Sequence, residues 1–189
     1  MNKQVLIVLI CATISAPVFA APETYTIDSD HTFPSFEISH LGFSKHHGRF
    51  NNTSGQIVID SAAKSGSIEV KIDTASVDTG GEKLEKHLRA EDFFNVEKFP
   101  TMTFKSNKLN FKGDKLVAAQ GELTLLGVSK PVSLNIASFN CGNHPVNKKA
   151  MCGAEATATI KRSDFGMKYG VPAVGDEVKL TIQVEAYKN

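Results

Sequence analysis

Apolar and polar residues alternate with a period of two through most of the chain beyond residue 24. The segment near the C-terminus shows this clearly, because polar residues separate Val178, Leu180, Ile182 and Val184. Successive side chains of a β-strand point to opposite faces, so each such segment predicts a strand with one apolar face. The pattern predicts an all-β fold of about eight or nine antiparallel strands, arranged as a closed barrel or a sandwich.

One of the expected strands has small side chains on its inward face. Ala156 and Ala158 alternate with Thr157 and Thr159, although a filled barrel needs bulky inward residues. Several strands approach ten residues, so at about 3.3 Å per residue a barrel encloses an extended cavity of roughly 30 Å. Eight strands make a barrel that is wide enough for one slender ligand. The sequence therefore favours a hollow interior.

The stretch from Lys86 to Phe104 departs from the strand pattern. Leu84 and Leu88 are four residues apart and charged residues lie between them, which predicts one short helix with a single apolar face. Pro100 disfavours a helix at the residue before it, and Thr101–Lys105 is expected to be extended. We therefore expect a short helix that leads into a strand.

Phenylalanines follow this helix at positions Phe93, Phe94 and Phe99. Two interpretations of them stay open. Either they plug one end of the barrel, since buried phenylalanine is ordinary, or the helix and its aromatics form a lid over the mouth of an apolar cavity. In the second case, polar side chains of the same stretch lie at the rim beside the polar end of a ligand, namely His87, Arg89 and Asp92.

Residues 1–20 have the pattern of a cleaved signal peptide. Lys3 precedes the apolar run Val5–Ala16, and small residues near Ala20 supply a cleavage site. The run is interrupted by polar residues and proline and lacks a stop-transfer pattern, which argues against a permanent anchor. Cys11 lies inside the run and does not follow a small residue, which argues against lipoprotein processing. We expect export to the periplasm.

Residues 21–189 are expected to form a single domain with a sizeable core. Without Lys3, the charged residue of the signal peptide, the chain keeps 20 basic and 20 acidic side chains. It therefore has no electrostatic footprint for nucleic acid.

Two cysteines remain after the signal peptide, and an even pair in an oxidising compartment usually forms a bridge. We predict a disulfide between Cys141 and Cys152, which would stabilise the fold by roughly 2 to 3 kcal/mol. A competing interpretation is a metal site of Cys141, His144 and Cys152, but this spacing matches no common zinc pattern.

The chain carries no recognisable catalytic motif. It has no G-x-S-x-G, no H-E-x-x-H and no Gly-rich phosphate loop. Adjacent residues on a strand face opposite sides, so His46 and His47 are poor joint ligands, and Ser44–Gly48 is expected to be a solvated turn. No C-x-x-C-H marks covalent haem. We expect no enzyme, metal or cofactor; an exported metal- or haem-associated protein and a packed barrel without ligand stay open as alternatives.

Five motifs occur in an order that is typical of one protein family. They are Asp30-His31-Thr32 before Phe36, His40-Leu41-Gly42-Phe43-Ser44, His87-Leu88-Arg89 with Asp92-Phe93-Phe94 and Phe99-Pro100-Thr101, Gly121-Glu122-Leu123-Thr124 with Gly127-Val128-Ser129-Lys130-Pro131-Val132, and Ser163-Asp164-Phe165-Gly166-Met167. In this order they closely resemble the YceI-like family of exported bacterial proteins. The resemblance covers nearly all of residues 21–189, and the combination is far more specific than any one motif.

The resemblance implies an eight-stranded antiparallel lipocalin-like barrel with an elongated apolar tunnel and one short helix. It implies that the tunnel binds a long-chain amphiphile, typically a polyisoprenoid such as an isoprenoid quinone or prenyl phosphate. It also implies a homodimer, loading from membranes without stable insertion, and no catalytic residues. Such a tail is insoluble in water, and each buried methylene contributes about 0.8 kcal/mol to binding.

We expect inward-facing apolar residues of the strands and of the helical stretch to line the tunnel. They are Phe36, Ile38, Phe43, Val70, Ile72, Leu84, Leu88, Phe93, Phe94, Phe99, Met102, Phe104, Leu123, Leu125, Leu134, Ile136, Ala156, Ala158, Phe165, Met167, Leu180 and Ile182. The head group needs donors at a mouth of the tunnel, and arginine can fork onto phosphate or carbonyl oxygens. The candidates are His40, Arg49, His87 and Arg89.

Overall fold

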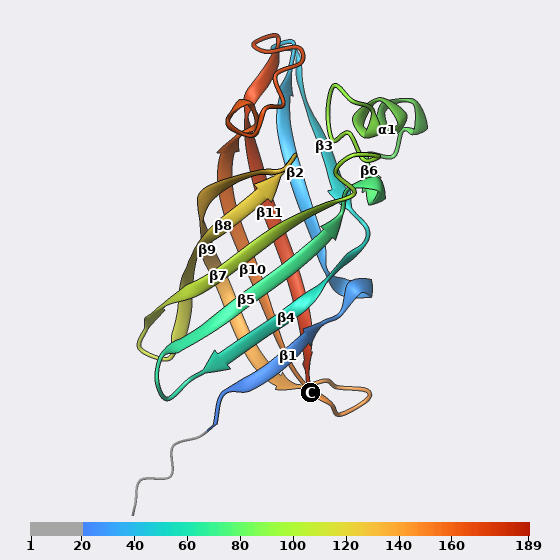
Figure 1. Cartoon of the computed structure of the whole chain (residues 1–189). Coiled ribbons are helices and arrows are strands. Elements are labelled where there is room, and N and C mark those ends of the chain that lie inside the picture. Colours follow the sequence, from blue (N-terminus) through green and yellow to red (C-terminus); the bar gives the residue numbers. More distant parts are fainter. Residues whose placement is uncertain (1–20) are drawn as a thin grey trace, which may run out of the picture.

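Antiparallel β-strands make up most of the computed structural model, which describes residues 21–189 (Figure 1). The signal peptide expected at residues 1–20 lies outside the described residues. The strands are β1 (Glu23–Ile27), β2 (Phe33–His40), β3 (Ser44–Phe50), β4 (Thr53–Asp60), β5 (Ser65–Asp73), β6 (Val77–Asp78), β7 (Thr101–Lys112), β8 (Lys115–Leu125), β9 (Val128–Asn143), β10 (Ala150–Lys161) and β11 (Val174–Lys188). The helix α1 (Glu82–Arg89) and the short 3-10 helices η1 (Ser29–His31), η2 (Thr74–Ser76) and η3 (Arg162–Phe165) connect them.

Eight of the described strands close into a ring. Its order is β1, β4, β5, β7, β8, β9, β10 and β11, and β11 pairs with β1 to close it. The prediction of an eight-stranded antiparallel barrel is therefore confirmed. Strands β2, β3 and β6 were not expected to stand outside the ring; they extend its sheet from the edge of β11.

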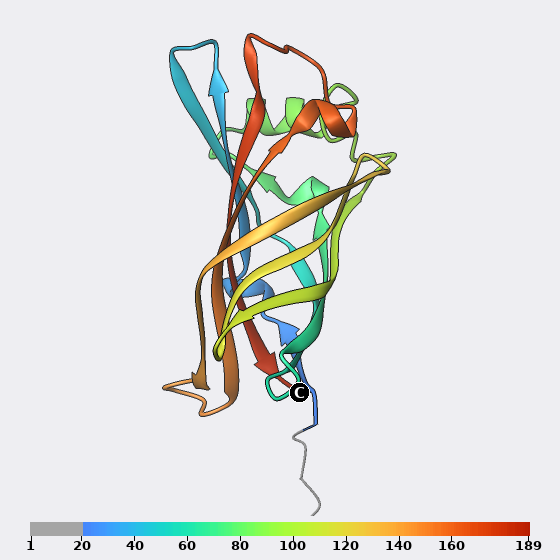
Figure 2. The same cartoon turned by 90° about the vertical axis from the view of Figure 1, so that its left-hand side faces the viewer.

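Strand β11 is long enough to belong to both the ring and the extension. Its residues 186–188 pair with β1, whereas residues 174–183 pair with β2. The extension therefore continues the barrel wall towards one end of the molecule. Figure 2 shows the β2–β3 hairpin, the connection from β10 to β11, and α1 together at this end. We call it the mouth end.

The tip of the β2–β3 hairpin differs from the sequence-based expectation. The turn expected at Ser44–Gly48 is wrong, because β3 begins at Ser44. The chain reverses within Leu41–Phe43 instead, where Leu41 and Gly42 adopt positive φ angles of 54° and 74°. Tight hairpin turns need such angles, and glycine adopts them without strain. The two adjacent histidines therefore lie in a strand.

Buried side chains form three clusters along the barrel, of which the largest lies at the mouth end. The largest cluster combines strand residues with residues of the connections at the mouth end, namely Phe50, Ile72, Val77, Phe94, Met102, Phe104, Leu123, Leu125, Phe165 and Met167. Two smaller clusters follow, the first of Leu109, Leu116, Ala119, Ile136 and Ala156, and the second of Tyr25, Ile59, Cys152 and Ala186.

Two polar residues hold the connection from β10 to β11. The guanidinium of Arg162 is buried and donates hydrogen bonds to the carbonyls of Val174 and Gly175 at 3.0 and 2.8 Å. Burial lowers the pKa of Arg162. The carboxylate of Asp176 accepts hydrogen bonds from the backbone N–H and the hydroxyl of Ser163 at 2.9 and 2.8 Å, and these bonds lower the pKa of Asp176. The hydrogen bonds of Arg162 and Asp176 hold the β10–β11 connection in place at the mouth end.

Helix α1 is joined to the barrel by its own acidic side chain. Glu85 Oε1 accepts hydrogen bonds from the backbone N–H groups of Thr79 and Gly81 at 3.0 and 3.2 Å, so it caps the start of the helix. No helix among residues 21–189 is long and apolar enough to cross a membrane.

Candidate functional site

An elongated apolar cavity of about 400 Å³ lies inside the barrel. Its lining reaches from Cys152 and Ala186, near the C-terminal end of β11, to α1 and the β2–β3 hairpin. Aliphatic and aromatic side chains make up most of the lining. Among the described residues that line it, Arg162 is the one with a permanent charge, and its guanidinium donates hydrogen bonds to the backbone carbonyls of Met167, Val174 and Gly175. Such a cavity suits an extended, uncharged chain.

The cavity meets solvent at the mouth end. Three residues of the lining are exposed, namely His47, His87 and Tyr169. They lie in β3, in α1 and in the connection from β10 to β11, which all meet at this end (Figure 1). The polar groups that reach the cavity from outside are therefore imidazoles and a phenol.

Most apolar residues expected in the tunnel do line the cavity. They are Phe36, Ile38, Val70, Ile72, Leu84, Leu88, Phe93, Phe94, Met102, Phe104, Leu123, Leu125, Leu134, Ile136, Ala156, Met167, Leu180 and Ile182. Strand alternation put the strand residues of this set on the inner face. Whether they contact a ligand stays a prediction.

Four of the expected tunnel residues lie outside the cavity lining. Phe43 is exposed at the hairpin tip, because the turn removes it from the alternation of the strands. Phe99 packs at the β8–β9 turn, where a Cβ on Gly127 would come within 3.0 Å of its ring. Phe165 is the last residue of η3 and is buried in the largest core cluster. Ala158 belongs to the same strand as Ala156, yet it is not part of the lining.

The two arginines expected at the head group also lie elsewhere. The guanidinium carbon of Arg49 lies 4.5 Å from the ring centre of Phe33, and its Nε is 3.7 Å from Asp78 Oδ2. Arg89 donates hydrogen bonds to the carbonyls of Ala75 and Val77 at 2.9 and 3.0 Å, so it anchors α1. Both side chains are able to bind a phosphate or carbonyl oxygen of a ligand. In the fold, however, Arg49 contacts Phe33 and Asp78, and Arg89 bonds to backbone carbonyls.

Of the two interpretations of the phenylalanines, Phe94 fits the plug and Phe93 fits the lid. Phe94 is buried and meets Phe50 edge to face with ring centres 5.3 Å apart, so it is a plug in the wall. Phe93 is only partly buried, and its ring lies 4.9 Å from His87 and 5.4 Å from Tyr169. His87 and Tyr169 are themselves 5.5 Å apart. These three rings, which we call the lid cluster, join α1 to the β10–β11 connection across the mouth.

The sequence did not indicate two other aromatic side chains of the mouth, His46 and Tyr169. His46 stacks on His40 with ring centres 4.1 Å apart and an angle of 12° between the planes. Both line the cavity, because His46 pairs with the inward-facing Ile38. The pairing of β2 with β3 was the signal that could have found His46. Tyr169 lies in a connection without periodicity, so no sequence pattern indicated it.

At the opposite end of the barrel, which we call the closed end, Tyr25, Ile59, Cys152 and Ala186 form a buried cluster, and a disulfide joins two neighbouring strands of the wall. Cys141 in β9 and Cys152 in β10 are direct partners across the two strands and are bonded to each other, as predicted. The alternative metal site is therefore wrong, because neither thiol is free to bind an ion. His144 Nδ1 instead accepts hydrogen bonds from the backbone N–H groups of Val146 and Asn147, both at 3.2 Å.

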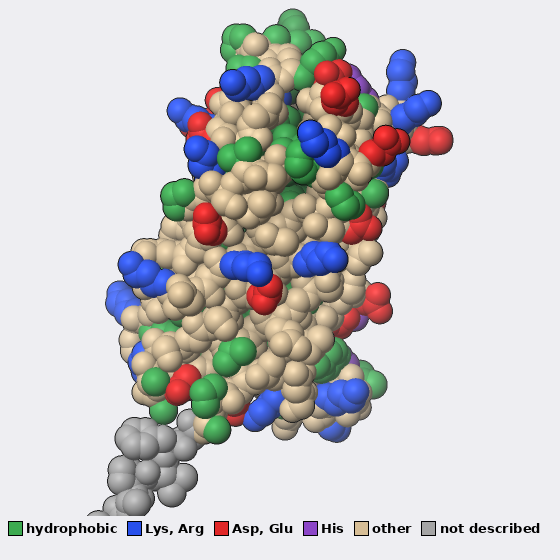
Figure 3. All heavy atoms as spheres, viewed as in Figure 1, with side chains coloured by type: hydrophobic (Ala, Val, Ile, Leu, Met, Phe, Trp, Pro, Cys, Tyr) green, Lys and Arg blue, Asp and Glu red, His purple; other side chains and the backbone are tan. Residues whose placement is uncertain are grey.

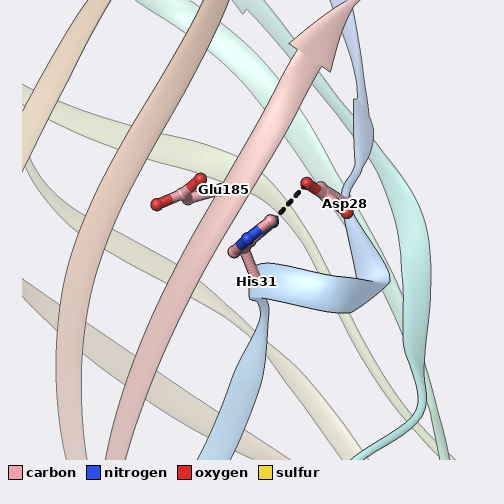
Figure 4. A group of neighbouring side chains, drawn as sticks. All are labelled: Asp28, His31 and Glu185. Carbon is pink, nitrogen blue, oxygen red and sulfur yellow. Dashed lines mark hydrogen bonds and ion pairs between the residues drawn. The ribbon is translucent and has the colours of Figure 1, made fainter. Parts of the chain in front are cut away.

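One group of side chains on the outer surface has the composition of a metal site. The ligand atoms of Asp28, His31 and Glu185 all lie within 4.8 Å of one another (Figure 4). However, His31 Nδ1 is 2.7 Å from Asp28 Oδ2, and the other oxygen of Asp28 accepts from the N–H of Asp30 at 3.1 Å. The Asp28 carboxylate raises the pKa of His31. This geometry fits an ion pair that holds η1 at the corner between β1 and β2.

Comparisons with known proteins point in one direction. A family model described as YceI-like domain matches residues 25–186. A protein of Shewanella baltica named UPF0312 protein is 36% identical over 191 residues, which span 100% of each chain. The crystal structure of Burkholderia cenocepacia BcnA superposes with a TM-score of 0.71 and 25% identity, and covers 85% of this chain and 99% of its own. A polyisoprenoid binding domain from Saccharophagus degradans has the same fold, with a TM-score of 0.66, 19% identity and coverage of 87% and 98%.

Proposed function

This chain belongs to the YceI-like family, and we propose that it is a periplasmic binding or carrier protein for a long-chain amphiphilic lipid. The lipid is a polyisoprenoid, such as an isoprenoid quinone or a prenyl phosphate, with its tail in the barrel. The polyisoprenoid binding domain of Saccharophagus degradans shares the fold, which supports this choice.

The cavity is the observation that carries the proposal. Its volume of about 400 Å³ lies in the range of about 300 to 1,000 Å³ that ligand sites usually have. Each methylene of a tail moved there from water contributes about 0.8 kcal/mol, so an isoprenoid chain gains affinity with every unit it buries. The guanidinium of Arg162 is paired with backbone carbonyls, and any further unpaired charge inside such a lining would be costly. The lining residues therefore select a long apolar chain.

The mouth supplies the contacts for a head group. The imidazoles of His40, His46 and His87 and the phenol of Tyr169 face the end of the cavity. Imidazole and phenol groups donate hydrogen bonds to carbonyl or phosphate oxygens. These donors therefore form the hydrogen bonds to a head group at the mouth. Arg49 and Arg89 do not, since each already contacts another part of the fold. We infer binding without catalysis, because no carboxylate in the lining orients an imidazole as a base.

The first test is what the protein carries. Freshly purified protein is extracted with organic solvent, the extract is analysed by mass spectrometry, and the stripped protein is offered a polyprenyl phosphate and an isoprenoid quinone. We expect one isoprenoid to co-purify or to be taken up at one molecule per chain. No extracted lipid together with no uptake of either compound would refute the proposal.

A pair of substitutions in β10 tests whether the lipid occupies the cavity. Ala156 lines the cavity and its neighbour Thr157 is exposed on the outer face. We expect Ala156→Phe to fill the cavity and lower the bound lipid several-fold, whereas Thr157→Phe adds the same ring outside and retains it. Far-ultraviolet circular dichroism confirms that both variants are folded. Equal lipid contents in the two folded variants would place the lipid outside the barrel.

A further inference from the structure

Large apolar side chains are exposed mainly at one end of the molecule. Among the described residues the large exposed ones are Leu41 (50% exposed), Phe43 (92%), Tyr169 (51%), Val171 (37%) and Val146 (81%). The first four lie on the β2–β3 hairpin tip and on the connection from β10 to β11, whereas Val146 follows β9 near the disulfide. We call Leu41, Phe43, Tyr169 and Val171 the mouth rim. Figure 3 shows apolar side chains gathered at this end.

The two segments of the mouth rim form one unit. The backbone N–H of Leu41 donates a hydrogen bond to the carbonyl of Ala173 at 2.8 Å, which ties the hairpin tip to the neighbouring connection. Tyr169 belongs both to the rim and to the lining of the cavity, and His40 next to Leu41 lines it too. The exposed apolar surface is thus continuous with the interior that we assign to the lipid.

Folding does not explain the residues at the hairpin tip. Leu41 adopts a φ angle of 54°, which is unfavourable for a residue with a branched side chain. Phe43 is almost fully exposed and so adds little to the core. Glycine, asparagine or aspartate is the usual residue at such a position. Exposed apolar groups of this kind indicate an interaction surface.

The composition of both segments fits a lipid surface. Residues 39–47 and 167–175 contain Lys45, Lys168 and three histidines, and they contain no acidic residue. Lys45 lies 2.6 Å from Glu37, so Lys168 and the histidines provide the remaining positive character. An anionic bilayer attracts such a surface, and a carboxylate would be repelled by it.

The shape of the mouth rim favours a bilayer over a protein partner. The rim consists of side chains on two protruding loop tips (Figure 2). A stable protein interface buries about 800 Å² on each partner and needs a complementary surface. Protruding apolar tips insert instead into the boundary between head groups and acyl chains, about 5 to 10 Å deep.

We propose that the mouth rim docks reversibly on an anionic lipid bilayer and places the open end of the cavity against the membrane. The inference rests on the proposed function, because it supplies the route by which an insoluble tail moves between membrane and barrel without crossing water. The lid cluster of His87, Phe93 and Tyr169 shares Tyr169 with the rim. Docking therefore brings lipid to the place where side-chain contacts alone cover the cavity.

The experiment compares the two ends with matched substitutions. Residues 21–189 are mixed with vesicles of phosphatidylcholine and phosphatidylglycerol, and bound protein is measured by flotation. One variant combines Leu41→Asn with Phe43→Ser, since asparagine tolerates the positive φ angle of residue 41. The control is Val146→Ser at the far end. We expect the rim variant to bind vesicles at least about tenfold more weakly, and the control to bind as wild type does.

A second readout separates docking from lipid binding. Each protein is also loaded with a polyprenyl phosphate from detergent, without vesicles. We expect the rim variant to take up the lipid from detergent as wild type does, but to extract it from vesicles more slowly. If wild type binds vesicles but takes up no isoprenoid by either route, the proposed function fails and docking stands.

Three results would overturn the docking proposal. The first is that wild type does not float with vesicles. The second is that the rim variant floats as well as wild type. The third is that sedimentation shows a dimer that the rim substitutions dissociate while vesicle binding is absent, which would assign the rim to a second copy of this chain.

Discussion

At the closed end of the barrel, near the end of β11, buried side chains pack together and a covalent bond between Cys141 and Cys152 joins β9 to β10. At the mouth end, contacts between separate segments do the corresponding work: the lid cluster joins α1 to the β10–β11 connection, and one hydrogen bond joins that connection to the hairpin tip. The disulfide and the buried cluster join strands that are already paired in the barrel wall, whereas the mouth contacts join separate segments that can part when side chains move. This difference makes the mouth end the natural passage for a ligand.

Phe94 tests the wall of the mouth end and has the largest expected effect. It is buried against Phe50, and replacing a buried phenylalanine by alanine removes apolar contact and leaves a cavity. We expect Phe94→Ala to lower the free energy of unfolding by about 3 kcal/mol or more, measured by urea denaturation. A loss below about 1 kcal/mol would show that Phe94 belongs to the movable lid.

The disulfide tests the closed end. The double variant Cys141→Ser, Cys152→Ser lacks a bridge between residues 11 apart in sequence, and we expect a loss of about 2 to 3 kcal/mol in the free energy of unfolding. The rate of lipid release should stay unchanged, because the mouth is not altered. Faster release in this variant would mean that the ligand also leaves at the closed end.

Phe93 tests the lid itself. It is partly buried and contacts His87 and Tyr169, so we expect Phe93→Ala to cost less than about 2 kcal/mol of stability but to speed the release of bound lipid several-fold. Fluorescence of a labelled polyprenyl ligand during transfer to acceptor vesicles measures the rate. Phe99→Ala is the matched control, since Phe99 comes from the same stretch but does not line the cavity. Equal rates in the two variants would contradict a lid at Phe93.

The sequence predicted the strands and the disulfide better than the turns of the mouth, for physical reasons. Alternation is a property of single strands, so it identified inward residues such as Ile38 and Leu180, and a pair of cysteines in an exported chain identified the disulfide. The mouth is built from turns and from pairings between strands. Phe43 was placed inside because the turn at Leu41 has no periodic signal, and His46 was missed because its direction depends on the partner strand β2.

Charged residues were the least predictable part. Arg49 and Arg89 have the chemistry of head-group ligands, yet a cation–π contact and two backbone carbonyls engage them. Residue type reports what a side chain can bind, whereas the fold decides what lies within its reach. The division of β11 between β1 and β2 was equally hidden, because a long alternating strand looks the same whether it has one partner or two on that edge.

Lowering the pH has the smallest expected effect, and we expect it to act differently on the two ends of the barrel. At the closed end, Lys188 and then Tyr25 hydrogen-bond to the carboxylate of Glu23 and lower its pKa. At the mouth end, Ser163 lowers the pKa of Asp176 through two hydrogen bonds. Both carboxylates therefore contribute stability that is present above their ordinary pKa values, about 4, and that is lost as the pH falls through the lowered values in the folded protein.

The two carboxylates should nevertheless differ in their effect on the ligand. Protonation of Asp176 releases the β10–β11 connection, which carries Tyr169 of the lid cluster, so we expect lipid release to quicken as the pH falls below about 4. Asp176→Asn should release lipid faster already at neutral pH and should lose this step, whereas Glu23→Gln should keep it because Asp176 and its bonds to Ser163 are unchanged. Release rates measured between pH 6 and pH 3 check this. If Glu23→Gln removed the step and Asp176→Asn did not, acid would act on the closed end. The closed end, and not the mouth, would then be the movable end of the barrel.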